Sequence, residues 1–259
     1  MNRTWTLPDV DFYVLWDDMD EGILPDPLEF LARTDDYNEF ETQRLRARAN
    51  LTAAPGDALD DLRGALAHPD ISIRVFGRDA RTPDDPQHCV RVLGVRKGPR
   101  GYVIRQLPGE TLWHSTGFVV TECEATRLGP LVAEQLPATE PGRGGEIPLP
   151  PPESVHLDYE YGQSAVYDSA PRRSVDSSEF LRAAVAHTGT IQVVQNLSRF
   201  GPRGAATRLL VWRDHIDDGR YAIAADNQPR AVPADTRRLT TMIDTAIADI
   251  VQAIKDERR

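Results

Sequence analysis

The sequence predicts an α+β fold built from one module that occurs twice, each copy running helix, antiparallel strands, helix. Two observations predict it. Segments with helical periodicity give way to runs with a period of two, and this order of elements occurs twice along the chain. In addition, "LRGALAH" (Leu62–His68) returns as "LRAAVAH" (Leu181–His187), 119 residues later (181 − 62). We therefore expect one compact domain with an N-terminal half over residues 1–136, a connector over 137–154 and a C-terminal half over 155–259.

The N-terminal half opens with helices. A stripe at helical spacing predicts a first helix beginning near Pro8 and formed by Phe12, Leu15, Trp16 and Met19. After a break rich in glycine and proline, an amphipathic stretch over Tyr37–Leu51 predicts a second helix. Asp57 is expected to cap a third, short helix that closes at His68 and Pro69.

Strands follow these helices. Period-two runs predict strands over Ile71–Phe76, Cys89–Val95, Gly101–Leu107 and Thr111–His114. The turns between the last three runs are short, so we expect those strands to pair antiparallel. "TECE" from Thr121 fits a capping box, which predicts a helix starting there, with Glu124 reaching back to the cap.

The second half repeats this order. Ser177 is expected to cap a short helix, "TIQVVQNL" to form a strand, and "RLLVWRDH" and "GRYAIAAD" to form a hairpin across "IDDG". Without a gap, the 119-residue shift places Val92 on Val211, Tyr102 on Tyr221 and Ile104 on Ile223, and makes the helix ends coincide at His68 and His187. The closing helix has an apolar stripe formed by Leu239, Met242, Ile243, Ala246, Ile247, Ile250, Val251 and Ile254. A chance match of an alanine-rich stretch is the alternative to duplication, and the tyrosine-rich segment from Val155 to Asp176 has no clear period.

Composition narrows the classes of function. The formal charge of −10 and pI of about 5.1 disfavour binding to nucleic acid or anionic lipid. No apolar run approaches the ~18 residues of a membrane-spanning helix, so membrane insertion is not expected. Cys89 and Cys123 are the two cysteines, and the first residues lack the pattern of a secretory signal, which favours the cytoplasm.

Motifs for catalysis are missing from the sequence. It has no phosphate-binding loop and no nucleophile elbow, and no two histidines stand four residues apart, so we expect no cofactor and no metal site. Asp214, His215, Asp217 and Asp218 could suggest a metal or acid–base site, but a hairpin turn through Asp-Gly accounts for them more simply.

Two features suggest a binding role. Gly77–His88 is a long, charged, proline-bearing loop between two strands, and long loops in compact domains are usually functional or disordered. Trp113, Trp212, Tyr102 and Tyr221 lie on expected strands, where core packing is their more common role and contact with a partner the alternative.

Several stretches resemble the ESX (type VII) secretion-associated EspG family of actinobacteria. They are "FYVLWDDMDEGILPDPL", "DDLRGALAHPDISIRVFGRD", "GRGGEIPLPPPES" and "RFGPRG" followed by "LLVWRDHIDDGRYAI". The resemblance implies two pseudo-twofold-related halves that share a central sheet flanked by helical bundles. It also implies a cytosolic chaperone that holds a PE/PPE-type secretion substrate and catalyses no reaction.

In such a family member the partner contacts would map onto Gly77–His88, the strand around Trp212 and the last helix. We expect Arg78, Asp79, Arg81, Asp84 and Asp85 to form a polar rim and Trp212 part of the apolar centre. The alternatives are a ligand-binding regulator or small-molecule enzyme with a pocket between the halves, and a homodimeric scaffold.

Overall fold

A single ten-stranded antiparallel sheet forms the centre of the computed structural model, which describes residues 3–19, 22–53, 57–150 and 173–258. The strand order is β1-β5-β4-β3-β2-β7-β8-β9-β10-β6, so β2 and β7 pair in the middle. The strands are β1 (Arg3–Leu7), β2 (Ile71–Asp79), β3 (Val90–Lys97), β4 (Arg100–Pro108), β5 (Ser115–Glu124), β6 (Ile147–Pro148), β7 (Val185–Gln195), β8 (Thr207–His215), β9 (Gly219–Ala224) and β10 (Arg230–Pro233).

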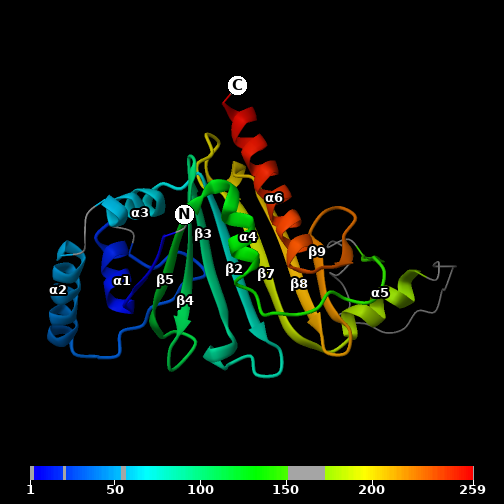
Figure 1. The fold of residues 1–259 in the computed structure, drawn as a ribbon, viewed down its shortest axis with the longest axis horizontal. Helices are drawn as coiled ribbons and strands as arrows, with labels where there is room; N and C mark the ends of the chain where they lie inside the picture. Colours follow the sequence, from blue (N-terminus) through cyan, green and yellow to red (C-terminus); the bar gives the residue numbers. More distant parts are fainter. Residues whose placement is uncertain (1–2, 20–21, 54–56, 151–172, 259) are drawn as a thin grey trace, which may run out of the picture.

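Helices cover both faces of this sheet. They are α1 (Asp9–Asp17), α2 (Tyr37–Ala53), α3 (Asp57–Ala67), α4 (Leu128–Ala133), α5 (Arg173–Arg182) and α6 (Thr236–Glu257). Figure 1 shows α4 and α6 lying across the middle of the sheet, with α1 to α3 at one end and α5 at the other. Successive side chains of a strand point to opposite faces. Val92 therefore packs in the cluster with α4 and α6, while Leu93 and Val95 pack with α1 to α3 on the opposite face.

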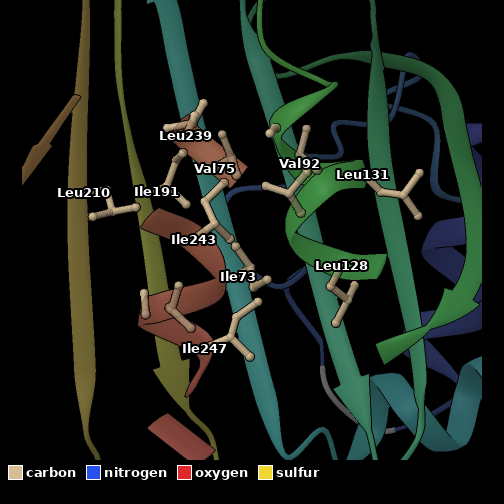
Figure 2. Close-up of a cluster of buried hydrophobic side chains, with 14 of the residues drawn as sticks. Ile73, Val75, Val92, Leu128, Leu131, Ile191, Leu210, Leu239, Ile243 and Ile247 are labelled. Atoms are coloured by element: carbon tan, nitrogen blue, oxygen red, sulfur yellow. The ribbon is translucent and has the colours of Figure 1, made fainter. Parts of the chain in front are cut away.

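The central core lies between α6, α4 and the middle strands (Figure 2). The helical stripe of α6 supplies Leu239, Ile243 and Ile247, which pack with Val75 of β2 and Ile191 of β7 in the same buried cluster. Burial of each such side chain stabilises the fold by roughly 1.5–3 kcal/mol. One helix of the C-terminal half thus covers strands from both halves.

Two further buried clusters lie on the opposite face of the sheet from α4 and α6. Helices α1 to α3 cover β3, β4 and β5, where the rings of Phe12 and Phe118 stack with centroids 4.2 Å apart. On the same side of the sheet as these helices, α5 places Phe180 against Tyr221 and Ile223 of β9.

The mixed helical and antiparallel architecture predicted from the sequence is confirmed, as are the helices near Pro8, at Tyr37 and at the C-terminus and the hairpin of β8 and β9. Two expectations for the region around β5 were wrong. The residues of the expected strand Thr111–His114 form a turn, and the next strand is β5. Thr121–Glu124 continues β5 instead of starting a helix, because β5 pairs along this stretch with β1 and β4.

The repeated heptapeptide does not mark equivalent structures. Leu62–His68 closes α3, but α5 ends at Arg182 and His187 lies inside β7. Ser177 lies within α5 and does not cap it. Residues 151–172, which include most of the tyrosine-rich segment, lie outside the described residues. In the part that is described, no helix is both long and apolar enough to cross a membrane.

Candidate partner-binding surface

The loop expected to contact a partner lies at the end of β2, at the lower edge of the sheet in Figure 1. β2 extends to Asp79, so the connection itself comprises residues 80–89, and we call it the β2–β3 loop. The structure places Arg78 and Asp79 in β2, and Arg81, Asp84 and Asp85 in the β2–β3 loop. All five therefore lie at the end of the central strands where β2 ends and β3 begins.

Asp79 anchors the start of the β2–β3 loop. Asp79 is 3% exposed, and its carboxylate accepts hydrogen bonds from the Arg81 side chain (Nη2 2.6 Å, Nε 3.1 Å) and from the Arg81 backbone amide at 2.7 Å. These bonds, those of the side chain foremost, hold the pKa of Asp79 well below its usual range. Asp79 is thus an internal support of the rim, while Arg81 is exposed.

The two acids of the loop differ in their surroundings. Asp85 caps a 3-10 turn over Pro86–His88 by accepting from the Gln87 amide at 2.9 Å, and lies 3.1 Å from Nδ1 of His88. Asp84 is exposed and makes no hydrogen bond or ion pair with any described residue. Its charge is therefore available to a partner.

Arg91, in β3 just after the β2–β3 loop, links this strand to the segments around Pro27 and Leu112. Its guanidinium donates to the carbonyls of Pro27 and Leu112 at 2.7 and 3.2 Å and lies over the ring of Phe76. Beside this junction Trp113 of the β4–β5 turn is 57% exposed. This end of the sheet thus presents one large aromatic side chain next to the charged loop.

Trp212 does not belong to this surface, which corrects the expectation that it forms the apolar centre. It is 1% exposed in the central core. Its indole lies over Gly77 and Gly189, where an added Cβ would come within 2.3 and 2.8 Å of the ring. Tyr102 and Tyr221 are also buried, so three of the four strand aromatics singled out in the sequence are core residues.

A row of ionisable side chains crosses four strands beside the β2–β3 loop. Cross-strand pairing places Asp79 opposite His187, His187 opposite Asp214, and Asp214 opposite Arg220. We call these four residues the charge row. Asp214 and Arg220 form a buried bidentate pair at 2.7 and 2.8 Å, and Thr139 donates to Asp214 at 3.0 Å.

Sequence reasoning missed the charge row because its members are distant in the chain. Asp214 was noted in the sequence as part of "RDHIDDGR", and that stretch was predicted to be a hairpin turn. The structure confirms the turn, which joins β8 to β9. The signal that could have found the row is the register of the β8–β9 hairpin, which pairs Asp214 with Arg220. Among the described residues, no group of three His, Cys, Asp or Glu side chains is arranged to hold a metal ion.

Grooves run along both sides of α6, the other element expected to contact a partner. One of ≈ 450 Å³ lies between α6 and the β8–β9 hairpin and includes Met242 and Leu209. One of ≈ 580 Å³ lies between α6 and the segment around Ala125. Near the end of α6, Leu197 and Phe200 are exposed on a loop tied to Glu257 through Ser198 at 3.0 Å. Apolar surface is thus available along this helix.

Two kinds of comparison with known proteins, by family model and by solved structure, give matches. A model of the EspG family matches residues 8–245. The fold is similar to that of the Mycobacterium tuberculosis type VII secretion system chaperone EspG5, whose structure was solved in complex with the PE25–PPE41 dimer. The TM-score is 0.56 at 14% sequence identity, and the match covers 95% of this chain and 96% of the other. No curated protein sequence matches the chain.

Proposed function

The chain belongs to the EspG family, and on that premise we propose that it is a cytoplasmic chaperone of type VII secretion that catalyses no reaction. Its partner would be a PE/PPE-type helical protein or heterodimer. The observation that carries the proposal is the family match over residues 8–245, supported by a fold similar to that of EspG5, a chaperone solved with a PE–PPE dimer.

The chaperone would act by covering apolar surface. A secretion substrate with an exposed apolar helical tip would aggregate, and removing such a patch from water is favourable by ~25 cal/mol per Å². An interface of ~1,600 Å² is a standard size for a stable complex. The exposed Trp113 and the grooves beside α6 are the apolar surfaces on which we expect this burial.

The β2–β3 loop would provide the polar rim. Arg81 and Asp84 are exposed in the loop and Arg78 is exposed beside it in β2, while Asp79 and Asp85 hold the loop in shape. Rim charges affect specificity and association rate more than they affect total affinity. We therefore expect the loop to select among substrates.

We also propose that the two halves are related by a pseudo-twofold axis through the β2–β7 pair. The strand order supports this, because β2, β3, β4 and β5 follow one another outward on one side as β7, β8, β9 and β10 do on the other. In both halves a helix precedes the first of these strands, α3 or α5, and a helix follows the last, α4 or α6.

The test is co-purification with PE/PPE pairs encoded beside the gene. Asp84→Lys should weaken capture of the cognate pair by about tenfold, because the substitution reverses a free rim charge. Asp60→Lys is the matched control, since Asp60 is exposed on α3, which Figure 1 shows away from the β2–β3 loop and from α6, and its exposed ion pair with Arg63 contributes little to stability.

Equal capture by both variants would exclude the β2–β3 loop from the interface. Failure of the unmodified chain to capture any PE/PPE pair would contradict the chaperone proposal itself.

A further inference from the structure

His187 lies between two carboxylates at the middle of the sheet, where β2 pairs with β7. Its Nδ1 is 3.6 Å from Oδ2 of Asp214 and its Nε2 is 3.9 Å from Oδ2 of Asp79. Both contacts are too long for hydrogen bonds, and Nδ1 is buried without a hydrogen-bond partner among the described residues. The ring is therefore placed between two negative charges without bonding to either.

A bulge creates this position. The pairing of β7 with β8 shifts between Val185 and His187, so that Ala186 is skipped and His187 stands opposite Asp214. β-bulges commonly redirect a side chain beside a functional element. The same segment holds the start of the β2–β3 loop, because the amide of Ala80 donates to the carbonyl of Ala186 at 2.8 Å.

Each carboxylate already has its own arginine. Asp79 is bonded by Arg81, and Asp214 by Arg220. The neutral imidazole thus satisfies nothing in the charge row, whereas an imidazolium would attract both carboxylates at distances of about 4 Å or less. The arrangement adds an attraction between β2, β7 and β8 when the ring is charged.

We propose that His187 is a positioning residue for the β2–β3 loop, and that its protonation draws Asp79 toward β7 and β8 and orders that loop. The proposal rests on the proposed function only in taking this loop as a partner contact. Protonation would thus make affinity for the partner depend on pH through the shape of the loop.

The direction of the pH effect follows from linkage. If the ordered loop favours the charged ring, protonation favours the ordered loop, so order is gained as pH falls and lost as pH rises. The charged groups that face the ring are Asp79 on β2 and Asp214 on β8, and behind them lie their own partners, Arg81 in the loop and Arg220 on β9. The lowered pKa of Asp79 keeps that carboxylate charged throughout the range in which histidine titrates.

Hydrogen exchange of the free protein tests the proposal. After correction for the intrinsic exchange rate, amides of residues 80–89 should be about threefold or more better protected at about pH 5.5 than at about pH 7.5. His187→Gln should remove this dependence, and His187→Lys, which stays charged, should keep the protection at both pH values. His88→Gln is the control for a competing source of pH dependence, because His88 lies in the loop itself, 3.1 Å from Asp85. If His187 is responsible, this variant keeps the dependence.

An equal pH dependence in the parent and in His187→Gln would overturn the proposal, and so would its loss in His88→Gln alone. If His187→Gln fails to fold, His187→Lys decides, since an undiminished pH dependence in that variant contradicts the role. Exchange is measured without a partner, so this outcome is independent of whether PE/PPE pairs are captured.

Discussion

At the scale of single residues, close packing fixes the end of the sheet from which the β2–β3 loop emerges. Gly77 pairs with Gly189, Gly189 pairs with Trp212, and the indole extends back over both glycines. Arg220 lies over the same ring, with its guanidinium carbon 5.2 Å from the centroid. Because Arg220 also binds Asp214, the aromatic packing and the charge row form one connected support beneath the loop.

Gly77→Ala tests this packing. The added Cβ would come within 2.3 Å of the Trp212 ring, so we expect the free energy of unfolding to fall by about 1–3 kcal/mol. Gly64→Ala is the matched control, because Gly64 lies in α3 with nothing within 4 Å of an added Cβ. The control should gain about 0.5–1 kcal/mol, since alanine favours a helix more than glycine does. Urea unfolding of both variants measures the difference, and similar stabilities would contradict this account of Trp212.

At the scale of elements, periodicity predicted the helices and strands that bury one face against the core. The stripe of α6 was predicted correctly because eight apolar residues share one face, and five of them are buried: Leu239, Ile243, Ala246, Ile247 and Ile250. The end of β5 was mistaken for a helix start for a physical reason. The threonine and glutamates of Thr121–Glu124 suit a capping box and the solvent-facing positions of a strand equally. Only the pairing of β5 with β4 and β1 decides between the two.

The α6 stripe yields a prediction about the central core. Ile243→Ala removes a fully buried side chain from the contact with β2 and β7, so unfolding should become easier by about 2–5 kcal/mol. Thr245→Ala, on the exposed face of the same helix, should change stability by less than about 0.5 kcal/mol. Thermal unfolding of the two variants tests it. A cost at Ile243 as small as that at Thr245 would mean that α6 does not hold the sheet.

At the scale of the whole molecule, the repeat indicated the order of elements but not their register. Tyr102 and Tyr221, matched by the 119-residue shift, both lie on the face covered by α1 to α3 and α5. Val92 and Val211, matched by the same shift, lie on opposite faces, since Val92 packs under α4 and α6 while Val211 packs beside Phe180. A gapless comparison cannot follow insertions in turns, so the seam of β2 with β7 and the charge row across it required the structure.

The shared core predicts that the halves unfold together. α6 belongs to the C-terminal half, packs on α4 of the N-terminal half and shares one buried cluster with β2, so neither half can keep its core without the other. Two tryptophans report on the halves separately, since Trp16 is buried with α1 to α3 and Trp212 in the central core. In variants that retain one of these and carry Phe at the other tryptophans, the fluorescence midpoint in urea should coincide with the midpoint from circular dichroism. If the fluorescence midpoints of Trp16 and Trp212 differed from each other and from the circular dichroism midpoint, the prediction would be wrong. The continuous sheet would then join two domains of independent stability, with the charge row between them.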